Sequence, residues 1–197
     1  MRQFQKNRVP EPRVKLTTRV RGRLDIEIGC GVGLHAVDYC RKNPKRTLIA
    51  IDKSQVRYQK MMDRIKKQSD VTNLIPIREN AIWFIAHEVQ NNSVGNYFFL
   101  YPNPYPKKGQ SNKRWHQMPF MQHVIDTLKK NGKIHLATNM KYYAEEAEEF
   151  FKDVWKLQLI GKSEYQGLSN APFSPRTHFE KKYLERGQTC WNLIFQK

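Results

Sequence analysis

The chain has 197 residues, and 35 lysines and arginines against 18 aspartates and glutamates give it a formal net charge of +17. This length favours one sizeable domain, and 39% hydrophobic residues are enough to build a core, which excludes a wholly disordered chain. We find no apolar run long enough to span a membrane and no signal-peptide pattern, so we expect a cytoplasmic protein with no membrane partner. Cys30, Cys40 and Cys190 lack metal-ligand or CxxC spacing and fit free thiols. The positive charge predicts a polyanionic partner, nucleic acid before anionic lipid, with simple solubility as the plainer alternative.

Basic residues crowd the first 23 positions, where Glu11 is the only acid and no hydrophobic period is visible. The cations of this segment are Arg2, Lys6, Arg8, Arg13, Lys15, Arg19, Arg21 and Arg23. We therefore predict a basic N-terminal arm over residues 1–23 and a single domain over residues 24–197.

The predicted elements after the arm alternate between strands and helices. Strands are expected at 24–28, 47–51, 74–78, 96–101, 133–138, 157–162 and 190–195. Helices are expected at 34–41, after Ser54, at 81–90, at 118–130 ending at Asn131-Gly132, and at 142–155. Such alternation implies an α/β fold with a mostly parallel sheet. No clear helix separates the last two strands, so we expect them to form an antiparallel hairpin across the 163–189 connection.

A glycine-rich turn, Glu27-Ile-Gly29-Cys-Gly31-Val-Gly33, follows the first predicted strand. Glycines allow a tight turn and close approach of the backbone to a ligand, while the next helix offers its N-terminal dipole. The G-x-G-x-G spacing differs from the dinucleotide fingerprint G-x-G-x-x-G, which disfavours a nicotinamide cofactor. The carboxylate of Glu27 suits a cationic group, such as the amino-acid end of S-adenosylmethionine.

Two further polar positions follow the second and third predicted strands. Asp52 can accept both hydroxyls of a ribose, and Asn80, followed by Ala81, can meet the amino group of an adenine. Each residue alone is also an ordinary helix cap or strand end. Their order on successive strand ends favours an adenosine cofactor, because open α/β sheets bind ligands at those ends.

The motifs together resemble the tRNA (guanine-N7-)-methyltransferases. Four stretches carry the resemblance: the glycine turn, Tyr101-Pro-Asn-Pro-Tyr-Pro-Lys107 with Asn112-Lys-Arg114, Ala137-Thr-Asn139 with Tyr143, and Thr177-His-Phe-Glu180 with Gly187. The resemblance implies a Rossmann-like fold of seven strands with helices on both faces. It also implies S-adenosylmethionine as methyl donor and N7 of a guanine in tRNA as acceptor.

Carried over by position, the resemblance implies a set of site residues. Around the cofactor it places Glu27, Gly29, Gly31, Gly33, Asp52, Asn80, Ala81 and Asn103, with Asn103 as the catalytic residue. Around the RNA it places Lys107, Asn139, Thr177, His178, Phe179 and Glu180. The scattered histidines lack ligand spacing, so we expect no metal. The chain is expected to act as a monomer or a homodimer.

Asparagine stands at positions 80, 103 and 139, where the family usually has aspartate. Methylation of guanine N7 needs no general base, because N7 carries a free lone pair and no proton, so catalysis is mainly placement. A carboxylate at position 103 would bind the guanine N1–H and N2–H edge. If this contact contributes to catalysis, we expect an amide there to remove roughly 2–4 kcal/mol of transition-state stabilisation.

The sequence is compatible with two alternative functions. Asn103-Pro104-Tyr105 also resembles the Asn-Pro-Pro-Tyr loop of methyltransferases that act on an exocyclic amino group of a nucleic-acid base. The three asparagines are also compatible with a catalytically weak RNA-binding homologue. Trp115 fits a core position or a base-stacking position equally well, and the acidic residues Glu145 to Glu149 are expected to form a solvated face.

Overall fold

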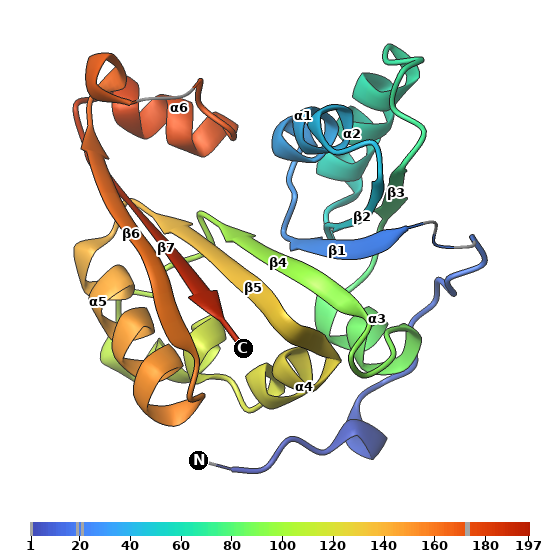
Figure 1. Cartoon of the computed structure of the whole chain (residues 1–197), viewed down its shortest axis with the longest axis horizontal. Helices are drawn as coiled ribbons and strands as arrows, with labels where there is room; N and C mark the ends of the chain where they lie inside the picture. Colours follow the sequence, from blue (N-terminus) through green and yellow to red (C-terminus); the bar gives the residue numbers. More distant parts are fainter. Residues whose placement is uncertain (1, 19, 21, 172–173) are drawn as a thin grey trace.

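The computed structural model describes residues 2–18, 20, 22–171 and 174–197, so Arg19 and Arg21 of the predicted arm and a short part of the 163–189 connection lie outside the described residues. The described chain forms a seven-stranded sheet in the order β3-β2-β1-β4-β5-β7-β6 (Figure 1). Its strands are β1 (Arg23–Ile28), β2 (Arg46–Ile51), β3 (Leu74–Ile77), β4 (Val94–Leu100), β5 (Leu128–Thr138), β6 (Gln158–Gln166) and β7 (Thr189–Gln196). Its helices are α1 (Leu34–Lys42), α2 (Gln55–Lys66), α3 (Ala81–Glu88), α4 (Phe120–Thr127), α5 (Lys141–Glu149) and α6 (His178–Glu185).

Strands β1 to β5 pair in parallel, and β7 runs antiparallel to both β5 and β6. The predicted mostly parallel sheet with a C-terminal antiparallel hairpin is therefore confirmed. The chain order reverses at β1, which has β2 on one side and β4 on the other. Ligands of open α/β sheets bind at such a switch point, outside the carboxyl ends of the strands.

Helices cover both faces of the sheet, and each face has its own core. One core joins side chains of α3, α4 and α5, such as Phe84 and Val124, to Ile26 and Phe99 of the sheet. The other joins α1 and α2 to Leu48 and its neighbours. Because both faces are covered, the central strands read as nearly continuous apolar runs.

Two carboxylates, Asp25 and Glu27, interrupt the apolar run of β1, and Asp25 is fully buried in the middle of the strand. Its carboxylate pairs with the guanidinium of Arg46 and accepts a hydrogen bond of 2.7 Å from the Tyr39 hydroxyl. A buried charge is tolerated only with such partners, so this trio holds the start of the central strand pair β1 and β2.

The N-terminal segment lies along α3 and α4 (Figure 1). The Phe4 ring sits 5.4 Å from that of Phe120, and the Leu16 amide donates to Glu88 at 2.8 Å. A single 3₁₀ turn (Lys6–Arg8) is its regular structure within the described residues. The division into an arm and a domain at residue 23 stays a prediction.

Several predicted elements differ from the structure, and the first is the end of a helix. The fourth predicted helix was expected to run through Lys130, but α4 ends at Thr127 and β5 begins at Leu128, which is fully buried beside Val94. Asn131-Gly132 does not stop a helix; it forms an irregularity within β5, with Asn131 at a positive φ of 63°.

The second difference lies in the 163–189 connection, which was expected to hold no helix and contains α6. The predicted helix 142–155 is also divided, because α5 ends at Glu149 and a π turn (Phe150–Val154) follows it. In the described part of the chain, none of the helices combines the length and apolar character needed to cross a membrane.

Candidate cofactor and substrate site

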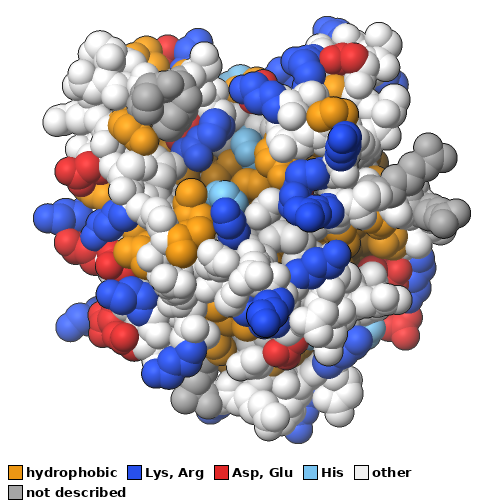
Figure 2. Space-filling view, viewed as in Figure 1, with side chains coloured by type: hydrophobic (Ala, Val, Ile, Leu, Met, Phe, Trp, Pro, Cys, Tyr) orange, Lys and Arg blue, Asp and Glu red, His pale blue; other side chains and the backbone are white. Residues whose placement is uncertain are grey.

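Two adjoining cavities open at the carboxyl ends of the parallel strands. The Asp52 cavity, of about 340 Å³, is lined by residues that include Asp52, Asn80 and Asn103. The Glu27 cavity, of about 480 Å³, is lined by Glu27, the glycine turn, α2 and the start of α6. Both cavities share Gly29, Arg57, Leu100 and Phe179. Figure 2 shows the notch between α6 and the α1/α2 pair, with Lys and Arg side chains around it.

The glycine turn has the conformation that its sequence predicts. Gly29, Gly31 and Gly33 have φ angles of +76°, +60° and +74°, in the region that side-chain-bearing residues rarely adopt. A Cβ atom at Gly33 would lie 2.6 Å from Cγ of Met61, whereas nothing lies within 4 Å of a Cβ atom at Gly29 or Gly31. Gly33 is therefore required by packing, while Gly29 and Gly31 leave room for a ligand beside the backbone.

Asp52 ties the end of β2 to the glycine turn. Its Oδ2 accepts a hydrogen bond of 3.0 Å from the Gly31 amide, and its Oδ1 accepts one of 2.8 Å from the Ser54 amide. The Arg57 guanidinium lies 3.4 Å from Oδ2. A carboxylate offers about four acceptor positions, so Asp52 keeps capacity for ribose hydroxyls while it fixes the turn.

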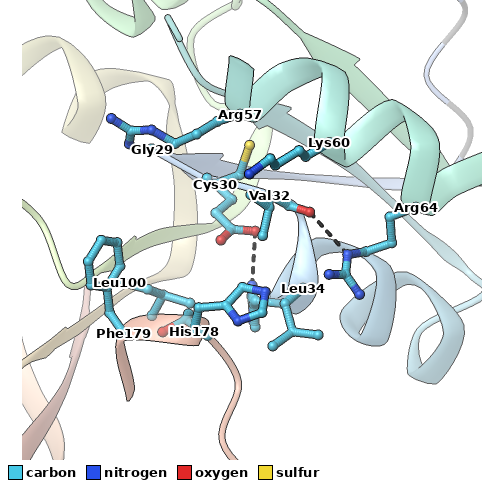
Figure 3. A pocket seen from close by; sticks show the side chains of 14 residues that line it. Gly29, Cys30, Val32, Leu34, Arg57, Lys60, Arg64, Leu100, His178 and Phe179 are labelled. Carbon is cyan, nitrogen blue, oxygen red and sulfur yellow. Dashed lines mark hydrogen bonds and ion pairs between the residues drawn. The ribbon is translucent and has the colours of Figure 1, made fainter. Parts of the chain in front are cut away.

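Glu27 is buried at the end of β1, where its Oε2 lies 3.0 Å from Nδ1 of His35 in α1 (Figure 3). Oε1 is left for a cationic ligand group. The His35 ring also packs against the Phe98 ring, 4.9 Å away. This packing holds the imidazole beside Oε2 of Glu27.

Asn80 and Asn103 both line the Asp52 cavity, and both also serve the local backbone. The Asn80 side-chain oxygen caps α3 by accepting from the Ile82 amide at 2.9 Å. The Asn103 oxygen accepts from the Tyr105 amide at 3.2 Å, closing a turn in a loop where Tyr101 and Tyr105 have positive φ angles of 54° and 45°. Ala81 lines the same cavity.

The predicted RNA segment Thr177 to Glu180 forms the start of α6. The Thr177 hydroxyl caps the helix by accepting from the Glu180 amide at 3.0 Å. Phe179 is 48% exposed and lines both cavities, and His178 lines the Glu27 cavity. The geometry thus places Thr177, His178 and Phe179 at the notch, on the side opposite the glycine turn.

Glu180 points the other way and is fully buried. Its carboxylate is paired with the Arg176 guanidinium and accepts a hydrogen bond of 2.9 Å from the Tyr101 hydroxyl. Burial alone would raise the pKa of the Glu180 carboxyl, but the Arg176 contacts outweigh it and hold the pKa below its usual value. Burial, followed by the Glu180 charge, raises the pKa of Tyr101, so the phenol stays protonated as a donor.

Three other predicted positions lie outside both cavities. Gly33 packs against Met61, as described above, and Lys107 is exposed at the start of a 3₁₀ segment (Lys108–Lys113). Asn139 donates to the Gln188 side chain at 3.2 Å. The structure therefore brings together the residues predicted for the cofactor other than Gly33, together with Thr177, His178 and Phe179, but not the other residues predicted for the RNA.

The 107–114 loop and the acidic helix also differ from expectation. Arg114 is buried, pairs with Glu146 of α5 and donates to the Tyr105 carbonyl at 3.0 Å. Glu146 is half-buried and paired with the loop, so the expected solvated acidic face is wrong at this position. Trp115 packs 5.5 Å from the Phe99 ring, as the core alternative predicts, and it also lines the Asp52 cavity. Base stacking at this position stays a prediction.

The basic face of α2 was not among the residues predicted for the site. Arg57, Lys60 and Arg64 all line the Glu27 cavity (Figure 3). Their spacing of three and four residues along a predicted helix was the available indication, since such positions share one face. No group of three potential metal ligands occurs within residues 2–18, 20, 22–171 and 174–197.

A family model described as "Putative methyltransferase" matches residues 22–193. The chain belongs to this methyltransferase family. Its relatives include a tRNA (guanine-N(7)-)-methyltransferase of Neisseria gonorrhoeae, 27% identical over 87% of this chain and 71% of that protein. A second, from Nitrosomonas eutropha, is 27% identical over 87% of this chain and 75% of its own length.

Solved methyltransferase structures share the fold. The 16S rRNA methyltransferase KamB matches with a TM-score of 0.63 and 14% identity, over 90% of this chain and 88% of that one. An antibiotic-related methyltransferase matches with a TM-score of 0.62 and 15% identity, over 90% and 89%. At such identities the matches support the Rossmann-like fold, and the methyltransferase family supplies S-adenosylmethionine as the cofactor.

Proposed function

We propose that this chain transfers the methyl group of S-adenosylmethionine to N7 of a guanine in tRNA. The observation that carries the proposal is the meeting of the Asp52 and Glu27 cavities at Gly29, between the 101–106 loop and the start of α6. This arrangement occurs in a chain of the methyltransferase family whose curated relatives are named for that reaction.

The residues of both cavities fit the cofactor. Buried carboxylates stand at the ends of β1 and β2, and the space beside Gly29 and Gly31 is open, as a bound ligand requires. Asp52 would hold the ribose, Asn80 the adenine amino group through its remaining lone pair, and Glu27 the amino group of the methionine end. The bound cofactor supplies an electrophilic methyl group on a sulfonium.

The protein's contribution to the methyl transfer is placement. Guanine N7 attacks with its own lone pair, the N7–C bond forms as the S–C bond breaks, and the positive charge passes to the base. No side chain has to remove a proton, so in-line alignment is the main catalytic term. Asn103 lies on the Asp52 cavity with its amide nitrogen free of the Tyr105 contact, in a position to contact the guanine edge.

The RNA partner is proposed from charge and from exposed aromatic surface. Phe179 presents an exposed ring at the junction of the cavities, and aromatic faces are what splayed bases stack on. Lys107, Lys108 and Lys113 are exposed on the neighbouring loop, and phosphate neutralisation by such lysines should dominate affinity. The proposal includes the basic arm over residues 1–23, a domain over 24–197, a monomer or homodimer, and a cytoplasmic location where tRNA is found.

The decisive experiment combines labelled S-adenosylmethionine with unmodified tRNA, followed by nucleoside mass spectrometry. Label in 7-methylguanosine is the expected result. Label in an N6- or N2-methylated base would favour the exocyclic-amino alternative, and cofactor binding without transfer would favour the weak RNA-binding homologue. Asp52→Ala should abolish transfer, while Asp63→Asn, on the exposed side of α2, serves as the matched control.

A further inference from the structure

The basic face of α2 overhangs the glycine turn, on the same cavity that Glu27 lines. Three of its cations, Arg57, Lys60 and Arg64, contribute to the wall. Two of these cations contact other groups of the protein. Arg57 lies 3.4 Å from Asp52, and Nε of Arg64 donates to the Val32 carbonyl at 3.1 Å.

Lys60 differs from its two neighbours. Within the described residues it makes no hydrogen bond or ion pair, although it lies on the cavity wall. In Figure 3 its side chain extends over the glycine turn, whereas Arg57 points away and Arg64 turns back to the Val32 carbonyl. An ammonium left without a partner beside a cavity is a binding group for an anion.

The proposed ligand of this cavity needs a cationic binding group. In the proposed function, on which this inference rests, Glu27 receives the amino group of the methionine end. That end is a zwitterion, so a carboxylate enters the same cavity and needs a cationic partner of its own. Glu27 cannot serve the carboxylate. Arg57 points away from the cavity in Figure 3 and contacts Asp52, and Nε of Arg64 is oriented by the Val32 carbonyl, which leaves Lys60 as the cation directed at this space.

We propose that Lys60 binds the carboxylate of the amino-acid end of S-adenosylmethionine, as the cationic counterpart of Glu27. Three residues of α2 then contribute to cofactor binding. Arg57 supports the ribose carboxylate Asp52, Lys60 holds the cofactor carboxylate, and Arg64 fixes the glycine turn through the Val32 carbonyl.

The test is isothermal titration calorimetry of two ligands that differ only in the carboxylate: S-adenosylmethionine and decarboxylated S-adenosylmethionine. Three proteins are compared: the natural chain, Lys60→Met, and Lys66→Met as a control on an exposed part of α2 outside both cavities. A charge-assisted hydrogen bond on a partly solvated wall should change affinity about ten-fold.

The expected result is selective. Lys60→Met should weaken S-adenosylmethionine about ten-fold, leave the decarboxylated ligand within about two-fold, and so remove the preference of the natural chain for the carboxylate. Lys66→Met should behave as the natural chain.

Equal losses for both ligands, or no loss for either, would overturn the inference. A loss of tRNA affinity with unchanged cofactor affinity would also overturn it and assign Lys60 to an RNA phosphate. If the natural chain bound neither ligand, the proposed function itself would fail, which is a different outcome from an ineffective Lys60 variant.

Discussion

Gly31 and Gly33 have similar left-handed backbones, but an added methyl group meets different surroundings at the two positions. At Gly31 nothing lies within 4 Å of the new Cβ atom, while at Gly33 it would lie 2.6 Å from Cγ of Met61. Alanine in the left-handed region costs about 1–2 kcal/mol. Overpacking against Met61 adds about 1–3 kcal/mol. We therefore expect Gly31→Ala to lose about 1–2 kcal/mol of unfolding free energy and Gly33→Ala about 2–5 kcal/mol.

Cofactor affinity should follow the opposite order. The methyl group of Gly31→Ala enters the space that the cofactor needs beside the turn, so this variant should be folded but bind S-adenosylmethionine poorly. Urea unfolding measures the stability and calorimetry the affinity. Gly109→Ala is the control, since this exposed glycine has no positive φ and an added Cβ meets nothing within 4 Å.

A second substitution isolates the contact with Met61. If the clash causes the extra loss, Gly33→Ala combined with Met61→Ala should be more stable than the sum of the single changes by about 1–3 kcal/mol. Equal stability losses at positions 31 and 33, additive effects of the pair, or full cofactor affinity of Gly31→Ala would each refute the packing argument.

Three further outcomes can be checked independently. Asn103→Asp should raise kcat/KM for N7 methylation about ten-fold or more, because a carboxylate stabilises the positive charge on the base. The carboxylate also keeps an acceptor for the Tyr105 amide. Single-turnover kinetics measure this, and a lower rate of N7 methylation would indicate a site adapted to another target atom. Tyr101→Phe removes the hydrogen bond to Glu180 and should lower the unfolding free energy by about 1–2 kcal/mol in urea unfolding, so unchanged stability would contradict a stabilising role of this hydrogen bond. Burial lowers the pKa of His116 to about 3 and that of His135 to about 4, from 6.5. Between pH 6.5 and 5 these histidines become protonated in the unfolded chain but stay neutral in the folded chain. The unfolding free energy should therefore fall by up to about 2 kcal/mol per histidine over this range. An unfolding free energy that does not change with pH would contradict this.

The turns and helix caps could be predicted from the sequence, because they depend on residues close together in the chain. The glycine turn, the Ser54 cap of α2 and the Asn80 cap of α3 all occur where the sequence predicts them. Each depends on residues within a few positions of one another, so its conformation follows from backbone preference and nearby donors.

Contacts between distant residues could not be predicted in this way. Glu180 was assigned to the RNA because its motif matches a substrate segment, yet it pairs with Tyr101, 79 positions earlier in the chain. The same motif, Thr177-x-x-Glu180, is also a capping-box pattern, which indicates the start of a helix and could have predicted α6. The end of α4 was misplaced for a related reason, because burial of Leu128 beside β4 outweighs the helical tendency of the preceding residues.

The positive charge is divided between two kinds of residue around the site. The arginines Arg57, Arg64, Arg114 and Arg176 are committed to carboxylates or carbonyls of the protein itself. A guanidinium suits this use because its planar fork reaches two acceptors at once. The exposed lysines of the 107–113 loop keep their charge for solvent and ligands. Replacing an arginine should therefore distort the cavities and weaken cofactor binding, whereas replacing a lysine of this loop should reduce the salt dependence of RNA binding and leave the cavities intact.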